Sequence, residues 1–173
     1  EYFHFVAEDC TSAKLFLRFR GRRHALCTAN HNMLSAIFLG TVVGVSDGDT
    51  LTVVNNNKQE VRIRLAEIEA PEAGQPYGTT SKQSLSELCF GKQAQIAPRV
   101  KDKHGRTVAR VTCNGVDANA EQVNRGMAWV YRKYAKDNKL YVLQHEAKVA
   151  KRGLWSDPSP IPPRAWRQQP RQM

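Results

Sequence analysis

Residues 40–68 read GTVVGVSDGDTLTVVNNNKQEVRIRLAEI. β-Branched residues are frequent in this stretch, and two turn-forming segments interrupt it, DGDT at 47–50 and NNN at 55–57. From 60 to 68, apolar and more polar residues alternate, as they do in a strand with one buried face. The pattern predicts three consecutive strands joined by tight turns, of which the third is half-buried.

A helix and two more strands are predicted next. The loop at 70–78 holds two prolines and two glycines, which disfavour regular structure. Thr80-x-x-Gln83 has the spacing of a capping box, and Gly91 ends the helix that this box would begin. Strands are expected at 92–99 and 107–113, around a DKHGR turn at 102–106.

The last third of the chain is predicted to contain two helices. Asn119 is placed to cap a short helix that ends at Gly126, and the aromatic segment at 128–134 reads as extended. Five strands, with one helix after the third and two after the fifth, predict an α+β (mainly β) fold: a five-stranded OB-type β-barrel with about three packed helices. The final helix is indicated by apolar residues on one face: Leu140, Leu143, Ala147, Ala150 and Leu154.

A chain of 173 residues is long enough for one domain of ordinary size. We expect this domain at 36–157, preceded by an N-terminal extension at 1–35, for which disorder is one interpretation, and followed by a Pro/Arg-rich surface tail at 158–173. No run of about 18 apolar residues exists, so no membrane span is expected. The extension contains Cys and His residues at a spacing that matches no zinc pattern: Cys10, His24, Cys27 and His31.

The composition is basic, with 26 Lys and Arg against 16 Asp and Glu and a net charge of +10. The excess is not confined to the ends, because residues 36–157 alone hold 18 basic and 13 acidic side chains. A basic domain suits a polyanionic partner, such as nucleic acid or an anionic membrane surface. Solubility alone explains such a charge equally well, so the decision depends on the residues of a site.

Carboxylates are expected to gather at one end of the barrel. In a three-stranded meander, the turn after the first strand and the end of the third strand lie at the same end, which brings Asp47 and Asp49 near Glu67, Glu69 and Glu72. Carboxylates so close together repel one another unless a cation or arginines lie among them. Hard cations such as Ca²⁺ prefer oxygen ligands of this kind.

Two arginines, Arg64 and Arg106, make the set suitable for phosphate chemistry. Their planar guanidinium groups match the geometry of phosphate oxygens. Phosphodiester hydrolysis needs a cation at the phosphoryl group, a carboxylate that takes a proton from water, and arginines that stabilise the growing charge. Each motif alone is usually a turn or a solvated surface group, but the combination favours a metal-dependent phosphodiesterase.

Over residues 40 to about 157, the chain resembles the staphylococcal nuclease (thermonuclease) family. The matching motifs are VVGVSDGDTLTV, RIRLAEIEAPE, DKHGRTVARV and NRGMAWV, the last followed by a helix that ends in KRGLW. Within the family, the chain looks closest to nuclease homologues of Gram-negative bacteria and their plasmids. The resemblance implies an endonuclease that cuts DNA and RNA with little sequence specificity and leaves 5′-hydroxyl and 3′-phosphate ends.

The resemblance also implies roles for particular residues. It implies Ca²⁺, with Mg²⁺ or Mn²⁺ as alternatives, bound by Asp49, Glu69 and the backbone carbonyl of Ala70, with Asp47 behind them. Glu72 matches the carboxylate usually assigned as the general base. The remaining matches are the phosphate arginines, Arg64 and Arg106, and the nucleotide contacts, Lys103, His104 and Tyr134.

The chain departs from the family pattern at four positions. Glu69 is one methylene longer than the usual Asp, which leaves the metal preference and the rate open. Ala70 replaces Thr, which matters little if only its carbonyl binds the metal. His104 replaces a usual Tyr, and Arg132 stands where one family member has a substrate-contacting Tyr.

The resemblance further implies a disulfide between Cys89 and Cys113, because the segments that they end run near one another in this family. The alternative is two separate buried thiols. A disulfide would indicate an oxidising compartment, either the periplasm or the outside of a bacterial cell, with the cytoplasm as the remaining alternative.

Two other functions fit part of the sequence. One is a non-catalytic OB-fold module that binds nucleic acid after losing its site, and the other is a basic interaction module whose acidic cluster binds structural calcium. The presence of all the carboxylates and both arginines favours catalysis. We expect DNA and RNA as partners and no membrane, and we take a monomer as the default while the oligomeric state stays open.

Overall fold

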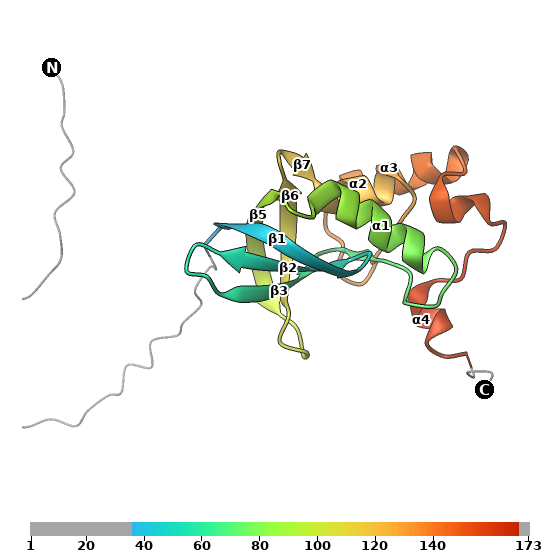
Figure 1. Ribbon diagram of the computed structural model, residues 1–173. Coiled ribbons are helices and arrows are strands. Elements are labelled where there is room, and N and C mark those ends of the chain that lie inside the picture. The colour runs from blue at the N-terminus through green and yellow to red at the C-terminus, as the bar shows by residue number, and fades with distance from the viewer. Residues whose placement is uncertain (1–35, 170–173) are drawn as a thin grey trace, which may run out of the picture. The chain divides into compact units, whose positions relative to one another are not determined.

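The structure is a computed structural model that describes residues 36–169. The extension at 1–35, for which disorder was one interpretation, lies outside the described residues, and so do the four Cys and His residues named above. One sheet has the strand order β3-β2-β1-β5-β6-β7, with β7 covering only Val116–Asp117 (Figure 1). The five barrel strands are β1 (Phe38–Asp47), β2 (Thr50–Asn55), β3 (Glu60–Leu65), β5 (Gln93–Lys101) and β6 (Thr107–Cys113).

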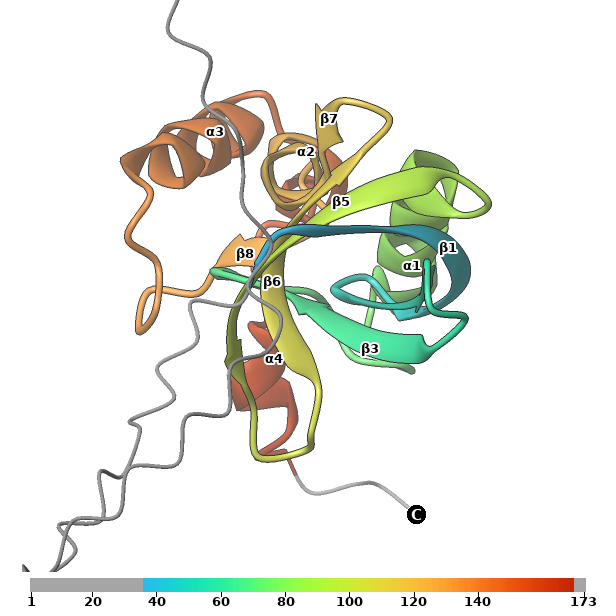
Figure 2. The ribbon, with the colours of Figure 1, turned by 90° about the vertical axis from the view of Figure 1, so that its left-hand side faces the viewer.

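Pairing between β3 and β6 closes the barrel. Neighbours in the sheet order are antiparallel, whereas β3 and β6 run parallel, with Ile63 opposite Thr107. β1 pairs with both β2 and β5, and register shifts after Val42 and Val45 accompany its bend (Figure 2). The five-stranded barrel predicted from the sequence is confirmed.

One face of each strand fills the interior of the barrel. Along β3, Arg62 is exposed and Ile63 is fully buried, as the alternating pattern predicts. Gly40 is required where β1 crosses β2, because a Cβ there would lie 2.7 Å from the carbonyl oxygen of Val54. The large apolar side chains with no exposed surface include Leu51, Val53, Ile63, Leu65, Ile96 and Val111.

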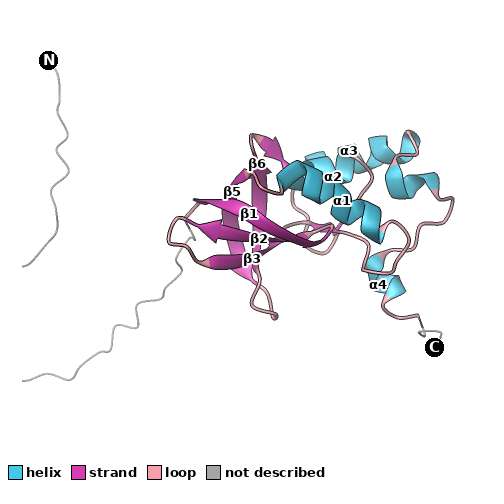
Figure 3. Ribbon diagram, in the orientation of Figure 1, coloured by secondary structure: helices cyan, strands magenta, loops and turns pink. Residues whose placement is uncertain are grey.

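Helices gather on one side of the molecule and the barrel strands on the other (Figure 3). Three of these helices are substantial, as expected: α1 (Gly78–Cys89), α2 (Ala118–Asn124) and α3 (Asn138–Val149). The remaining elements are η1 (Gly153–Ser156), α4 (Pro163–Trp166) and a ribbon of β4 (Ile68–Glu69) with β8 (Trp129–Val130). Within residues 36–169, no helix is long and apolar enough to cross a membrane.

The first helix begins differently from the prediction. α1 starts at Gly78, directly after Tyr77 in a left-handed conformation with a φ of 66°, and no side chain caps it. Thr80 and Gln83 already lie inside the helix, so the predicted capping box does not form. The cause is tertiary, because a Cβ at Gly78 would collide with the carbonyl oxygen of Glu72 and the loop therefore folds tightly against the helix start.

The second helix and the aromatic segment also differ from the prediction. Asp117 rather than Asn119 caps α2, because the Asp117 side chain accepts a hydrogen bond from the N–H of Ala120. Asn119 is instead fully buried and accepts a hydrogen bond from the N–H of Val111 in β6. Of the segment expected to be extended, only 129–130 form a strand, and a turn begins just after Tyr131.

A disulfide joins Cys89, at the end of α1, to Cys113, at the end of β6, with their Cα atoms 5.3 Å apart. Both residues are buried in the core. The bond spans a sequence separation of 24 residues and attaches the first helix to the barrel.

We expect the variant Cys89→Ala/Cys113→Ala to lose about 3 kcal/mol of unfolding free energy. The disulfide closes a loop in the unfolded chain, and without it the unfolded state gains conformational entropy. Chemical denaturation of the variant and the wild type measures this difference. The single variant Cys89→Ala should lose nearly as much, since either change removes the same bond. Mass spectrometry of peptides from the non-reduced wild type that finds Cys89 and Cys113 as free thiols would contradict the prediction.

Candidate active site

The DGDT turn joins β1 to β2 and is fixed from two sides. The Oδ1 atom of Asp47 accepts a hydrogen bond of 3.0 Å from the N–H of Asp49. From α2, the buried Gln122 donates through Nε2 to the carbonyl oxygen of Gly48 at 2.8 Å. A Cβ at Gly48 would lie 2.8 Å from the Cβ of Ala70, so only glycine allows this close approach.

Asp49 connects the turn to the first arginine. Its Oδ2 accepts hydrogen bonds from Nη2 of Arg64 at 3.3 Å and from the N–H of Ala70 at 3.4 Å. Its Oδ1 accepts one from the hydroxyl of Thr50 at 2.8 Å. The Arg64 guanidinium also lies 5.7 Å from the ring centre of Tyr131. These contacts hold Arg64 in one place before any substrate arrives.

The second arginine, Arg106, is held by the turn that precedes it. Asp102 accepts bonds of 2.9 Å from the N–H groups of His104 and Arg106, and one of 2.8 Å from Nε of Arg106. Burial would raise the pKa of Asp102, but the hydrogen bonds from Arg106 and His104 outweigh it and lower that pKa. Nη1 of Arg106 donates to the Thr50 hydroxyl at 3.2 Å, so Thr50 links Arg106 to Asp49.

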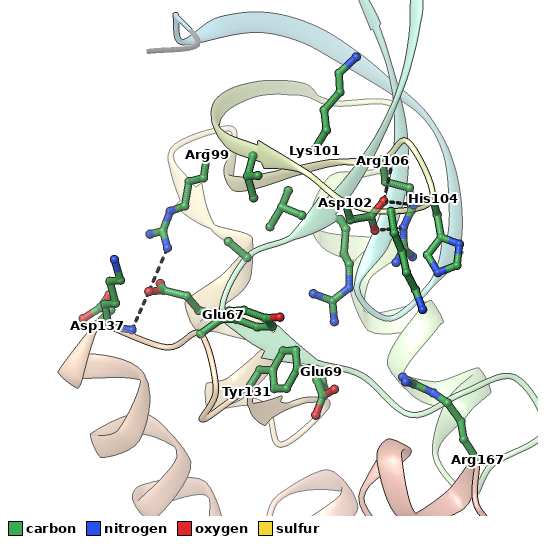
Figure 4. A pocket seen from close by; sticks show the side chains of 17 residues that line it. Glu67, Glu69, Arg99, Lys101, Asp102, His104, Arg106, Tyr131, Asp137 and Arg167 are labelled. Atoms are coloured by element: carbon green, nitrogen blue, oxygen red, sulfur yellow. Dashed lines mark hydrogen bonds and ion pairs between the residues drawn. The ribbon is translucent and has the colours of Figure 1, made fainter. Parts of the chain in front are cut away.

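A cleft of about 1130 Å³ opens beside these arginines (Figure 4). The residues predicted for the site divide into two groups with respect to this cleft. Those that line it are Arg64, Glu69, Lys103, His104, Arg106 and Tyr134. Those that do not are Asp47, Asp49, Ala70 and Glu72. Asp49 is only 8% exposed and communicates with the cleft through its bond to Arg64.

Two acidic side chains of the predicted site, Asp47 and Glu69, have raised pKa values. Burial and the charge of Asp49 raise the pKa of Asp47 from 3.8 to about 6. Burial also raises the pKa of Glu69, although Arg64 and Arg167 act in the opposite direction. A raised pKa means that the ionised form of each group would be stabilised by a nearby cation.

The donor set fits a cation that keeps part of its water shell. Among the described residues, no three His, Cys, Asp or Glu side chains form a metal site by themselves. Asp49, Glu69 and the carbonyl of Ala70 would supply two carboxylates and one carbonyl, all oxygen donors, and water would complete the coordination. Hard divalent cations prefer such donors.

Glu72 lies in the loop after β4 and is bound by the C-terminal tail. Its Oε1 accepts hydrogen bonds from Arg167 at 2.7 Å (Nε) and 2.6 Å (Nη2). Its backbone N–H donates to Oε1 of Gln75 at 3.0 Å. The tail expected at 158–173 therefore reaches the site, and the side chain of Glu72 is 40% exposed beside it.

Glu67 does not join the other carboxylates, contrary to the prediction. Its backbone is left-handed, with a φ of 66°, and its buried carboxylate pairs with Arg99 at 2.9 Å and Arg110 at 3.4 Å. It also accepts a hydrogen bond from the N–H of Lys136 at 2.8 Å. Burial would raise the pKa of Glu67, but these cationic and N–H partners outweigh it and lower that pKa. Glu67 therefore stabilises the fold at another part of the cleft (Figure 4).

Four residues of the site were not assigned from the sequence: Thr50, Asp102, Tyr131 and Arg167. Thr50 and Asp102 belong to motifs that were identified, and an Asp that begins a turn typically accepts backbone N–H groups. Tyr131 follows the two-residue strand β8, which the sequence pattern did not delimit. Arg167 gives no local signal, because its partner lies 95 positions away in the sequence.

The chain is similar in sequence to known nucleases. The sequence profile described as staphylococcal nuclease homologue matches residues 62–157. An uncharacterized endonuclease of Escherichia coli is 44% identical over 136 residues, which are 78% of this chain and 88% of the relative. A micrococcal nuclease of Shigella flexneri is 40% identical over 143 residues, 76% and 82% of the two chains. An uncharacterized endonuclease of Haemophilus influenzae is 42% identical over 128 residues, 74% and 72%.

A barrel with two arginines beside a cleft rich in basic side chains, together with these relatives, defines a nuclease, and hence a hydrolase. The chain belongs to the staphylococcal nuclease family, which confirms the resemblance seen in the sequence. Nucleases of this family generally depend on a metal ion.

The raised pKa of Asp47 predicts a stability that depends on pH. Below about pH 4 this carboxyl is protonated in the folded and unfolded states, and above pH 6 it is ionised in both. Ionising the buried carboxyl costs free energy, and this cost lowers the stability of the folded state in full only above the pKa of about 6. In EDTA, we expect Asp47→Asn to raise the unfolding free energy by about 2 kcal/mol at pH 7.5. The gain should shrink as the pH falls from 6 to 4.

Thermal or urea unfolding across this pH range measures the effect. Glu60→Gln, an exposed carboxylate at the start of β3, serves as the control and should change stability by less than about 0.5 kcal/mol. A metal-free Asp47→Asn variant that is less stable than the wild type at pH 7.5 would refute the prediction.

Proposed function

We propose that this nuclease is a metal-dependent endonuclease that hydrolyses phosphodiester bonds of DNA and RNA with little sequence specificity. The observation that carries the proposal is the link from Arg64 through Asp49 and Thr50 to Arg106, at the edge of a cleft that Glu69 also lines. A phosphate placed there meets two guanidinium groups that are already in position. The presence of both arginines together with these carboxylates supports catalysis over the alternative of a binding module that has lost its site.

Arg64 and Arg106 stabilise the negative charge that grows on the phosphate oxygens. Each is oriented by a carboxylate, Asp49 for Arg64 at 3.3 Å and Asp102 for Arg106 at 2.8 Å. Because these bonds exist in the free protein, little reorganisation is needed when the transition state forms. Thr50 couples the two arginines, so the distance between them is fixed by the barrel.

Glu72 acts as the general base in the proposed reaction. It takes a proton from water, and the resulting hydroxide attacks phosphorus. The bond from phosphorus to the 5′ oxygen of the next nucleotide breaks, that oxygen takes a proton from solvent, and Glu72 afterwards releases its own proton to solvent. The products carry a 3′-phosphate and a 5′-hydroxyl, as the family resemblance implies. The partial exposure of the Glu72 side chain allows water to reach it.

The proposed metal is Ca²⁺, with Mg²⁺ or Mn²⁺ as alternatives, held by Asp49, Glu69 and the Ala70 carbonyl, with Asp47 behind them. Support comes from the raised pKa of Asp47 and of Glu69, because a nearby cation would stabilise the ionised form of each carboxyl. When bound, the ion would polarise the phosphoryl oxygens and offset their charge. Glu69 is longer than the usual Asp of the family, and this difference affects which metal is preferred. The order of preference is therefore measured with each metal in turn.

Substrate contacts along the cleft favour phosphates and base faces over base edges. Lys103 and His104 lie in the hairpin turn before Arg106, and Tyr131 and Tyr134 pack edge to face with ring centres 4.9 Å apart. Basic side chains bind the backbone and aromatic rings stack on any base, so neither selects a sequence. Single-stranded segments, whose bases are free to stack, are the preferred substrates in this proposal.

The disulfide supports an extracytoplasmic location, in the periplasm or outside the cell, since such bonds persist in oxidising compartments. A monomer is the proposed state, because the site is assembled from elements of a single chain.

We expect Arg106→Ala to lower kcat roughly 100- to 1,000-fold while KM changes little, because the guanidinium acts on charge that is present only in the transition state. Cleavage of a fluorogenic single-stranded oligonucleotide, and of plasmid DNA and RNA, measures this with Ca²⁺, Mg²⁺, Mn²⁺ or EDTA. Wild-type activity should disappear in EDTA.

Arg62→Ala is the matched control, because Arg62 lies two residues before Arg64 on β3 but is exposed. It removes the same charge and should leave kcat near that of the wild type. Tight DNA binding without cleavage in any metal would establish the binding-module alternative, and cleavage that survives EDTA would remove the metal from the proposal.

A further inference from the structure

The C-terminal tail is docked on the loop that carries Glu72. This tail follows the region matched by the family profile, which ends at residue 157. Nε2 of Gln75 donates to the carbonyl oxygen of Ile161 at 2.6 Å, and Pro163, at the start of α4, is buried. The tail therefore has its own anchoring contacts before Arg167 is reached.

Gln75 joins the loop to the tail by hydrogen bonds to both. Its Oε1 accepts the N–H of Glu72 at 3.0 Å, and its own N–H donates to the carbonyl oxygen of Glu72 at 3.0 Å. The same buried side chain binds Ile161. The backbone of Glu72 is thus fixed from one side and the start of the tail from the other.

The side-chain contact between Arg167 and Glu72 uses only one carboxylate oxygen. Nε and Nη2 of Arg167 both donate to Oε1 of Glu72, at 2.7 Å and 2.6 Å. Within residues 36–169, Oε2 of Glu72 accepts no hydrogen bond from a side chain or backbone group. Arg167 also lines the cleft and lies below Arg106 and His104 in the view of Figure 4.

We propose that Arg167 is a positioning residue for Glu72, supplied by the C-terminal tail. Arg167 holds one oxygen of the carboxylate, which fixes the rotation of this exposed side chain and leaves Oε2 directed to accept a proton from water. A base that is oriented by a third group is a recurring arrangement in active sites. The inference rests on the proposed role of Glu72 as the general base.

Two other roles of Arg167 predict different kinetics. An arginine that shields Glu72 in the free enzyme would lower activity, so its removal would raise kcat. An arginine that binds substrate phosphate by itself would act mainly on KM and independently of Glu72. The contact with a single oxygen favours positioning, because the second oxygen stays open.

The test compares Arg167→Ala, Arg167→Lys, Glu72→Gln and the double variant Arg167→Ala/Glu72→Gln in the full chain, with the fluorogenic oligonucleotide as substrate. Glu72→Gln should lower kcat by at least roughly 100-fold. Arg167→Ala should lower kcat about tenfold with KM unchanged, in the range found for partners that orient an active group. Arg167→Lys should recover part of that loss, because it restores the charge without the two-pronged bond.

The decisive measurement is the double variant. If Arg167 acts through Glu72, then Arg167→Ala causes no further loss when Glu72 is already Gln. Losses that multiply, together with a raised KM, would show a phosphate-binding role, and a kcat above that of the wild type would show shielding. Either outcome overturns the inference.

Arg164→Ala is the matched control, because Arg164 lies on α4, which Arg167 directly follows, and its charge also acts on Glu69, but it does not bond to Glu72. It should leave kcat near that of the wild type, and unfolding curves of all variants establish that they fold. If Glu72→Gln keeps wild-type kcat, the proposed function is wrong. If Glu72→Gln is impaired while Arg167→Ala is not, only the positioning role is wrong.

Discussion

The parallel pairing of β3 with β6 is the constraint on which the site depends. It places Arg64 opposite Val108, so the strand that carries the first arginine runs beside the strand that follows the second. Parallel neighbours cannot be joined by a tight turn, and the chain between them supplies α1 and β5. Because the barrel closes at this pair, two arginines from separate motifs come to line one cleft and are linked through Asp49 and Thr50.

Two buried amide side chains of α2, Asn119 and Gln122, connect the helices to the site by hydrogen bonds. Asn119 accepts the N–H of Val111 at 3.0 Å and donates to the carbonyl of Ala66 at 2.8 Å, at the place where β3 has just ended. Gln122 holds the carbonyl of Gly48 and accepts the hydroxyl of Ser84. Polar groups that are fully satisfied in a core specify one arrangement, because any shift leaves a donor or acceptor unpaired. The rigidity of the DGDT turn is therefore a property of the whole fold.

Local patterns predicted the elements well and their ends poorly. Alternation along 60–65 and the turn residues at 47–50 were sufficient to place β1, β2 and β3, because strand period and turn chemistry act over a few residues. The start of α1 could not be predicted from Thr80, since the helix begins where the preceding loop packs against Gly78. Asn119 was expected to cap a helix, but its amide is used inside the barrel and Asp117 caps α2 instead.

The sequence by itself determined the barrel, the nuclease family and the identity of the charged groups, because these depend on composition, period and short motifs. Only the tertiary structure decided which carboxylate faces which cation. Glu67 and Glu69 are two residues apart and would share a face in a continuous strand, but β3 ends at Leu65 and Glu67 is left-handed, so their side chains separate. Arg167 bonds to Glu72 because the tail folds back onto the loop, and such a contact between distant segments leaves no trace in local sequence.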